Sequence, residues 1–367
     1  MRIAVFHELP VQSGSRKAVN EISKRLKRRN TVDLFIVGSK RNREESKFFS
    51  KIYFYRFLPV GWKGNSWKKR LRQDSIELFK LYLLNKRIAL DIKKRNYNVI
   101  FIHGSQFVNS PFILRFNLWP KIYYAHAANY ALVEDSVSEG LRNLNGFKLY
   151  YELLIRRIRN MLDSSSLKKA NYIFSNSFYT KGEIKKIYNR ESEVFYLGVD
   201  HKKFSPKAIK KNFDILFIGS MQETDGYSLL KKAVEKMGKI KIKALFIENE
   251  WVSSDAELAL LYNQSKVVVC LAHKEPLGLV ALEAMACGVP VVAVNEAGYR
   301  ETIINRQTGY LIKRDKKELQ RVLKLVLGDL RLRTNLGKKA RQHIVNNWTW
   351  DLKVKLMEEE FLKITHE

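Results

Sequence analysis

The feature that most constrains this fold is a short apolar run followed by a loop of small or polar residues and then a helix, repeated along the chain. The first unit joins the strand RIAVF, through the loop HELPVQSGS, to a helical segment over residues 16–29. In that segment Val19, Ile22 and Leu26 recur at intervals of three and four, as on one face of a helix. This order predicts parallel α/β sheets joined by right-handed crossovers. Further strands are expected at VDLFIVG and over 98–104, 121–127, 170–177 and 193–200.

A polar stretch, HKKFSPKAIKKNF over 201–213, separates this series from a second one. The α/β pattern then restarts at DILFIGS, with strands expected near 214–219, 242–247, 266–271, 289–294 and 310–312. A chain of 367 residues exceeds what one hydrophobic core usually serves. We therefore predict two doubly wound domains, over 1–203 and 204–345, with a crevice between the carboxyl ends of their sheets. Residues 346–367 are expected to form a final amphipathic helix.

Composition restricts the partners and the compartment. The formal net charge of +30 attracts anions, so nucleic acid, anionic lipid and a phosphorylated substrate all fit. The longest apolar runs have strand length, well below the roughly 20 residues of a membrane helix. The amino terminus has no secretory signal pattern, and a cytoplasmic protein is expected. Cys270 and Cys287 lack metal-ligand spacing and are expected to be buried thiols.

Two carboxylates stand on either side of a glycine turn in HKEPLGLVALEAM. Glu275 precedes the turn, and Glu283 lies one turn inside the helix that begins near Leu279. A glycine lets backbone amides approach a ligand closely, and a helix amino terminus favours an anion at Gly278–Val280. Both carboxylates could then accept hydroxyl protons from a polyhydroxylated ligand such as a sugar or ribose. The alternative is structural: Glu275 caps the helix and Glu283 forms a surface ion pair.

This block and the residues after it, AMACGVPVVAVNEAGYRETI and INRQTGYLI, resemble the retaining glycosyltransferases of family 4, also described as glycosyl transferases group 1. The resemblance covers nearly the whole chain. It implies the GT-B fold, in which two Rossmann-like doubly wound parallel-sheet domains face a central cleft. It also implies that the first domain binds the acceptor, that the second binds a nucleotide-sugar donor, and that the tail helix packs back on the first domain.

Residue by residue, the resemblance implies that Glu275 contacts the hydroxyls of the donor sugar and that Glu283 holds the ribose. The amides at Gly278, Leu279 and Val280 would meet the sugar and its phosphate. Glu301 falls in a turn where the family often has two glycines, of which only the second, Gly298, is present, because the first is Ala297.

In the first half, SGSRKAVNEISKRL resembles the family's glycine loop, with Ser13 in the first glycine position and Gly14 in the second. His126, in YYAHAANY, matches a histidine at the end of a strand that hydrogen-bonds the transferred sugar. A lone histidine is more often structural, but placement at a strand end beside a cleft favours the functional interpretation. For His103, in FIHGSQF, the structural interpretation is preferred.

One departure concerns the diphosphate. The family typically has an arginine and a lysine after the first strand of the second domain, whereas this chain reads IGSMQETDG, with Ser220 and Asp225 in those positions. A carboxylate near a departing phosphate is unfavourable. Arg16, Lys231, Lys232 and Lys274 are the candidate replacements, of which Lys274 is preferred, with a solvated surface lysine as the alternative. Otherwise the leaving group rests mainly on amides and the helix terminus, or transfer is slow or lost.

The family mechanism implies retention at the anomeric carbon without a metal ion or other cofactor, the departing phosphate helping to deprotonate the acceptor. No Asp-x-Asp metal signature appears near a strand end. The predicted function is therefore transfer of a sugar from a nucleotide-sugar donor to a glycan or lipid-linked acceptor. One rival is a non-catalytic relative that binds sugar, lipid or protein. A second rival, nucleic-acid binding, rests on charge alone without a recognised motif, so no specific nucleic-acid partner is expected.

Residues 53–98 and the helix FKLYYELLIRRIRNML from Phe147 place aromatic and basic residues side by side in the sequence. This pattern suits an anionic membrane surface, where rings lie at headgroup depth, and it also suits single-stranded nucleic acid. The alternative is a solvated helix with a buried apolar stripe of Ile76, Phe79, Leu83 and Leu90. Of the functional readings, peripheral membrane association is favoured, because it fits a lipid-linked acceptor.

Overall fold

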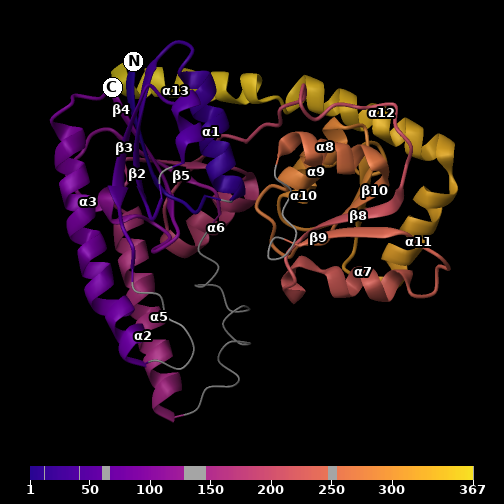
Figure 1. Cartoon of the computed structure of the whole chain (residues 1–367), viewed down its shortest axis with the longest axis horizontal. Coiled ribbons are helices and arrows are strands. Elements are labelled where there is room, and N and C mark those ends of the chain that lie inside the picture. Colours follow the sequence, from indigo (N-terminus) through magenta and orange to yellow (C-terminus); the bar gives the residue numbers. More distant parts are fainter. Residues whose placement is uncertain (12, 41, 60–66, 128–145, 247–253, 367) are drawn as a thin grey trace. The chain divides into compact units, whose positions relative to one another are not determined.

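Figure 1 shows the computed structural model, which describes residues 1–11, 13–40, 42–59, 67–127, 146–246 and 254–366. Part of the predicted basic segment, 60–66, and the end of YYAHAANY lie outside these residues. The chain divides into two compact units, each described by itself below. The first contains residues 1–176, 180–195 and 356–367, and the second contains 177–179 and 196–355. The domain boundaries after residues 203 and 345 stay predictions.

The first unit contains a parallel sheet of seven strands in the order β3-β2-β1-β4-β5-β6-β7. Its strands are β1 (Arg2–Glu8), β2 (Thr31–Gly38), β3 (Lys51–Arg56), β4 (Val99–Ser105), β5 (Lys121–Ala125), β6 (Tyr172–Ser175) and β7 (Glu193–Val194). Its helices are α1 (Gly14–Leu26), α2 (Trp67–Arg72), α3 (Leu78–Lys93), α5 (Gly146–Leu167) and α6 (Phe178–Tyr188), with one-turn segments η1 (Arg43–Lys47), η2 (Gln73–Glu77) and η3 (Phe112–Arg115). Central strands such as β1 are buried on both faces, as parallel sheets covered by helices require.

The strands of this unit differ from the prediction in two places. The strand β3 was not predicted, because its residues are only partly buried at the sheet edge and were read as part of the basic segment. The strand expected over 193–200 pairs in the sheet only at Glu193–Val194. An apolar run predicts an extended segment, but pairing depends on whether a neighbouring strand continues beside it.

The second unit contains a parallel sheet of five strands in the order β12-β11-β10-β8-β9. They are β8 (Phe213–Gly219), β9 (Ile242–Phe246), β10 (Ser265–Cys270), β11 (Val291–Val294) and β12 (Gly309–Ile312). The helices are α7 (Tyr227–Val234), α8 (Asp255–Gln264), α9 (Leu279–Ala286), α10 (Tyr299–Thr302), α11 (Lys316–Gly328) and α12 (Leu330–Asn347), with the one-turn segment η5 (Glu223–Asp225). All five strands overlap segments in which the sequence predicted them.

The tail forms α13 (Trp350–His366), and its last turns belong to the first unit. There Phe361 is fully buried, with its ring centroid 5.0 Å from that of Phe101 and 6.0 Å from that of Phe174. No helix among the described residues combines the length and the apolarity needed to cross a bilayer.

Truncating this aromatic anchor should destabilise the first unit. We expect Phe361→Ala to lower the free energy of unfolding by about 3–5 kcal/mol, the usual cost of emptying a buried aromatic site. The neighbouring Leu362 is 43% exposed, so Leu362→Ala is the matched control and should cost well under about 1 kcal/mol. Equilibrium denaturation with urea measures both. Equal losses in the two variants would contradict the anchoring role.

Candidate active site

In the second unit the predicted residues gather where the sheet winding reverses. Strand β8 lies between β9 and β10, so the connections leaving β8 and β10 run to opposite sides of the sheet. Open α/β sheets form their ligand crevice beyond the carboxyl ends of such a strand pair. The loop after β8 carries Ser220 and Asp225, and the loop after β10 carries Lys274, Glu275 and Gly278.

These two loops touch through their main chains. Gly226 has a left-handed φ of 81°, and a Cβ atom there would lie 2.6 Å from Leu271 Cβ and 2.8 Å from the Leu271 carbonyl oxygen. The His273 amide donates to the Thr224 carbonyl at 2.8 Å. Only glycine allows this approach, so Gly226 fixes the spacing of the two loops.

Glu275 is held by the turn that follows it. Its Oε1 accepts from the amide of Gly278 at 3.0 Å and from that of Leu277 at 3.5 Å. Burial raises the pKa of Glu275 above its ordinary value, the two amides act against this shift, and the Asp225 carboxylate adds to it. The alternative in which Glu275 caps helix α9 is therefore wrong, because its Oε1 accepts from amides of the turn before the helix.

Gly278 needs its glycine. It has φ +90°, and a Cβ atom there would lie 2.7 Å from the ring of the buried Tyr299. Helix α9 starts immediately after it without a side-chain cap. The amides of Leu279 and Val280 therefore stand in the first turn, where helix geometry supplies no acceptor.

Glu283 lies inside the unit. It is 6% exposed, and Tyr262 donates its hydroxyl proton to Glu283 Oε2 at 2.9 Å. The alternative of a surface ion pair is therefore wrong, because the side chain is buried between α9 and α8. Tyr262 and Tyr299 were not predicted, because their positions in the sequence give no sign that one meets the Glu283 carboxylate and the other the Gly278 turn.

The loop that the family resemblance assigns to the diphosphate carries a carboxylate that is bonded to its own backbone. The Asp225 carboxylate accepts a short hydrogen bond from the Ser220 amide. The Ser220 N–H group is thus bonded to a carboxylate of the protein, although an anionic ligand at this loop would need the same donor. Lys274 is partly exposed in the neighbouring loop and has a left-handed φ of 54°.

The turn at Ala297 keeps the shape expected of a glycine. Ala297 has φ +45°, and the next residue, Gly298, would place a Cβ atom 2.3 Å from the Pro276 carbonyl oxygen. The Gly298 amide donates to the Glu275 carbonyl at 2.9 Å. Gly298 is thus the residue that the Glu275 loop contacts closely. At Ala297 only a left-handed backbone conformation is required, and alanine adopts it.

In the first unit the winding reverses between β1 and β4. Gly14 is exposed as the first residue of α1, and Ser13 caps the helix by accepting from the Arg16 amide at 3.1 Å. A serine in the first glycine position thus acts as a helix cap. Arg16 is buried, and its Nε donates to Glu45 Oε1 at 2.6 Å, so a diphosphate would compete with this pair.

Three histidines lie at or just after the carboxyl ends of neighbouring strands. His126, after β5, has its Nε2 3.0 Å from Nδ1 of His103 on β4, and their rings stack. Burial lowers the pKa of His126 to about 3 and that of His103 well below its ordinary value, so both are neutral. His7, on β1, is also buried with a lowered pKa. His103 is buried, as its structural interpretation requires, and it is also the partner that orients the His126 ring.

The residue after His7 is a buried carboxyl group, Glu8, that was not among the predicted site residues. Glu8, at the end of β1, accepts from Asn85 Nδ2 at 2.8 Å and from the Ser105 hydroxyl. Burial raises the pKa of Glu8 to about 7 against these two hydrogen bonds. Its signal in the sequence was its position at the end of the first buried strand.

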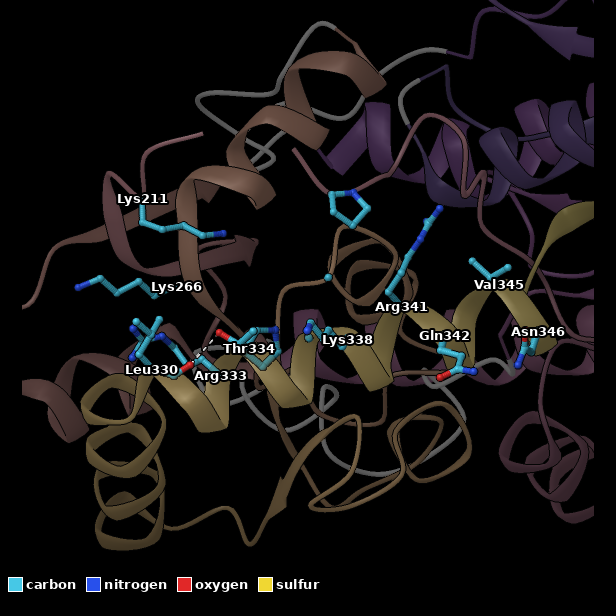
Figure 2. A pocket seen from close by; sticks show the side chains of 14 residues that line it. Lys211, Lys266, Leu330, Arg333, Thr334, Lys338, Arg341, Gln342, Val345 and Asn346 are labelled. Atoms are coloured by element: carbon cyan, nitrogen blue, oxygen red, sulfur yellow. Dashed lines mark hydrogen bonds between the residues drawn. The ribbon is translucent and has the colours of Figure 1, made fainter. Parts of the chain in front are cut away.

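The described residues contain no group of three or more His, Cys, Asp or Glu side chains arranged to hold a metal ion. A cavity of about 550 Å³ in the second unit contains none of the predicted site residues. It runs beside α12, near Lys266 and Pro290 at the amino ends of β10 and β11 (Figure 2). Its Arg341 donates to three backbone carbonyls, so this cation holds the chain together there.

Residues 239–343 match the family model of glycosyl transferases group 1, a segment that contains Glu275 and Glu283 but neither Ser220 nor Asp225. The chain is similar to a sucrose-phosphate synthase structure from Thermosynechococcus elongatus, with a TM-score of 0.74 at 16% identity over 99% of this chain and 98% of that one. A structure of Anabaena HepE in complex with UDP and glucose gives a TM-score of 0.68 at 15% identity, covering 99% of this chain and all of that one.

The chain has the GT-B fold. Among curated relatives, the capsular polysaccharide glycosyltransferase CapM of Staphylococcus aureus is 25% identical over 61% of this chain and 68% of its own length. Glycogen synthase of Mycobacterium tuberculosis is 38% identical over 95 residues, or 26% of this chain. The aligned segment spans about a quarter (23%) of the length of that synthase. The GT-B prediction is thus confirmed, and the group 1 family model matches the part of the chain that carries both glutamates.

Replacing Glu8 by glutamine should alter stability in a pH-dependent way. With a folded pKa of about 7 and an ordinary value of 4.5, the folded state binds more protons than the unfolded state between these values. The contribution of Glu8 to stability is therefore lost as pH rises from 4.5 to 7. We expect Glu8→Gln to change stability little at pH 4.5 and to raise it at pH 8 by up to about 3 kcal/mol.

The measurement is urea denaturation of both proteins from pH 4.5 to 8. The histidine contributions cancel in the difference, and the exposed Glu235→Gln provides a matched charge control. A difference that does not change with pH would contradict the raised pKa of Glu8.

Proposed function

We propose that this protein transfers a sugar from a nucleotide-sugar donor to a glycan or lipid-linked acceptor, with the donor bound by the second unit and the acceptor by the first. One observation carries the proposal: Glu275 and Glu283 stand on either side of Gly278 at the point where the second sheet reverses its winding. The group 1 match over this segment and the glycosyltransferase names of the curated relatives support it.

In this proposal the donor lies across the start of α9. Glu275 uses one oxygen to hold the Gly278 turn and offers the other to a sugar hydroxyl. The raised pKa of Glu275 suits this role, because a carboxyl group with high proton affinity is a strong hydrogen-bond acceptor. Leu279 and Val280 present first-turn amides to phosphate, and Glu283, oriented by Tyr262, accepts from the ribose hydroxyls.

We place the nucleotide on this unit by chemistry and by analogy with the Anabaena HepE complexes, which contain UDP and UDP-glucose. Assignment to family 4, retention of anomeric configuration and the departing phosphate as the proton acceptor are parts of the proposal. So is the absence of a metal or other cofactor from the reaction. Gly14 gives the ligand close access at the start of α1, and neutral His126 donates or accepts one hydrogen bond to the transferred sugar.

Neutralisation of the diphosphate is assigned mainly to the amides of the α9 turn and to Lys274. Arg16 is the weaker candidate because Glu45 already holds its guanidinium group. The Ser220 amide becomes a donor to phosphate only when Asp225 gives it up. We further propose that the protein works at an anionic membrane surface, where a lipid-linked acceptor is presented.

A second candidate function follows from the same Asp225 contact. If the carboxylate permanently occupies the Ser220 amide, the chain is a non-catalytic GT-B relative that binds a sugar, lipid or protein. Turnover of a nucleotide-sugar decides between the two functions.

A nucleotide that binds only the folded protein should raise its melting temperature. At about 100 times Kd the stabilisation is about 2.7 kcal/mol, or roughly 5–10 °C for a unit of this size. We expect one nucleoside diphosphate among UDP, GDP, ADP and CDP, and its sugar conjugates, to give this shift in thermal scanning. Glu283→Gln should remove most of it, whereas the exposed Glu235→Gln should keep it. Absence of any shift in the folded wild-type protein would refute the donor site.

Removing the charge of Asp225 should strengthen nucleotide binding. Asp225→Asn replaces a carboxylate near the phosphate position, and we expect nucleoside diphosphate affinity to rise roughly tenfold at low salt and less at high salt. Glu223→Gln removes a charge from the exposed turn of the same loop and is the matched control. Isothermal titration measures both. Equal affinity of wild type and Asp225→Asn would place the diphosphate away from this loop.

A further inference from the structure

Helix α5 carries large apolar side chains on the face opposite its buried side. Phe147 is 75% exposed and Met161 64%, and Tyr150, Leu154 and Ile158 between them are exposed as well. Their spacing of three, four, four and three residues places all five on one side of the helix. The buried residues of α5, which include Ile155, Ser166 and Leu167, fall on the other side. We name these five residues the α5 stripe.

The segment from η2 through α3 repeats this arrangement. Ile76, Phe79, Leu83 and Leu90 are exposed and recur at intervals of three, four and seven residues. The buried residues of α3 are Leu81, Asn85, Ile88, Ala89 and Ile92, which occupy the opposite side. The sequence-based alternative of a buried stripe over 76–90 was therefore wrong, since that stripe faces solvent. We name these four residues the α3 stripe.

Around both stripes the negative side chains are buried or partly buried, whereas the exposed charged side chains are positive. The described carboxylates of α2, η2 and α5 are Asp74, Glu77, Glu152 and Asp163, none of which is in the exposed class. The one on α3, Asp91, is half-buried and accepts from Tyr55 at 2.6 Å. The exposed charged side chains are cations: Lys68, Lys69, Arg72, Lys80, Lys86, Arg87, Lys93, Lys148 and Arg157. The solvent-facing surface of these helices thus combines apolar groups with positive charge.

Buried Asp74 joins the two segments. Its carboxylate pairs with Arg70 of α2 at 2.9 Å and with Arg159 of α5, and Tyr151 donates to it at 3.3 Å. Arg70 also donates to Glu152 of α5 at 3.0 Å. Helices α2 and α5 therefore lie side by side in the first unit (Figure 1) and are held by charged groups that are largely withdrawn from water.

We propose that the α5 and α3 stripes dock this protein on an anionic lipid bilayer, with the apolar side chains entering the headgroup boundary and the surrounding lysines and arginines meeting lipid phosphates. Contiguous exposed apolar surface rarely persists on soluble monomers without a binding role. Interfacial helices have this composition: apolar and aromatic residues on one side and cations beside them.

Other occupants fit less well. A second copy of this chain would bring the same cations face to face on a protein of net charge +30. Single-stranded nucleic acid matches the charge but stacks on aromatic rings, and it leaves Leu154, Ile158 and Met161 without a use. A solvated helix face would place polar residues where the α5 stripe stands.

Docking deepens the proposed function, because it names the surface at which a lipid-linked acceptor would be met. Vesicle binding nevertheless requires no nucleotide and no turnover. If the protein binds vesicles but no nucleotide, the docking proposal stands and the proposed function fails. If it binds nucleotide but no vesicles, the proposed function stands and the docking proposal fails.

The test is co-sedimentation of the full chain with vesicles of neutral phosphatidylcholine, with and without about one third phosphatidylglycerol, at physiological salt. We expect binding to the anionic vesicles only. Leu154→Ser with Ile158→Ser should weaken it roughly tenfold or more, since each removes apolar area from the boundary. Leu325→Ser with Leu330→Ser, at exposed apolar positions of the second unit, is the matched control and should bind as wild type.

A second measurement reports insertion directly. The Met161→Cys variant is labelled at its new thiol with an environment-sensitive dye. Because the native Cys270 and Cys287 are buried, the dye attaches at this one position. We expect its emission to shift to the blue with anionic vesicles, and that of Leu330→Cys to stay unchanged. Lack of vesicle binding, equal binding by the stripe variant and wild type at unchanged melting temperature, or an unshifted Met161→Cys dye would each overturn the proposal.

Discussion

The candidate site of the second unit depends on three glycines at which the backbone passes close to another part of the unit. Gly226 brings the loop after β8 against Leu271, Gly298 brings the turn after β11 against Pro276, and Gly278 passes under the Tyr299 ring. A methyl group at any of these positions would lie within 3 Å of its neighbour. The position of Glu275 follows from these contacts, because its carbonyl accepts from Gly298 and its carboxylate accepts from Gly278.

Of the departures from the pattern that the family resemblance implies, the two in the second unit each have a local physical account. Ala297 has a left-handed φ at the position where the resemblance implies glycine. This conformation costs an alanine about 1 kcal/mol, but it breaks no contact of the turn. Asp225 replaces a cation with a carboxylate and satisfies the Ser220 amide internally. The first change affects conformation alone. The second changes the electrostatics that a diphosphate would meet, so it bears on activity in a way that the first does not.

The first unit concentrates ionisable groups in a buried setting. His7, His103 and His126 have lowered pKa values, and Glu8 has a raised one, all chiefly because burial penalises the charged form. Neutral groups can accept and donate hydrogen bonds without bringing a charge into an apolar interior. The exposed charged side chains of α2, α3 and α5 in the same unit are all cations. Burial thus separates a neutral polar cluster at the strand ends from a cationic surface on the helices.

From the sequence alone, periodicity and loop composition determined the two parallel α/β series, most of the strands and the place of Glu275, Gly278 and Glu283 around the start of one helix. These follow from local spacing, which a linear pattern contains. Edge strand β3 and the short β7 could not be read this way, because pairing depends on neighbours distant in the chain. Tertiary structure alone decided that Arg16 meets Glu45, that Tyr262 meets Glu283 and that His103 meets His126. It also decided that the apolar residues over 76–90 face solvent. When a helix has apolar residues on two faces, the sequence does not show which face packs against the core.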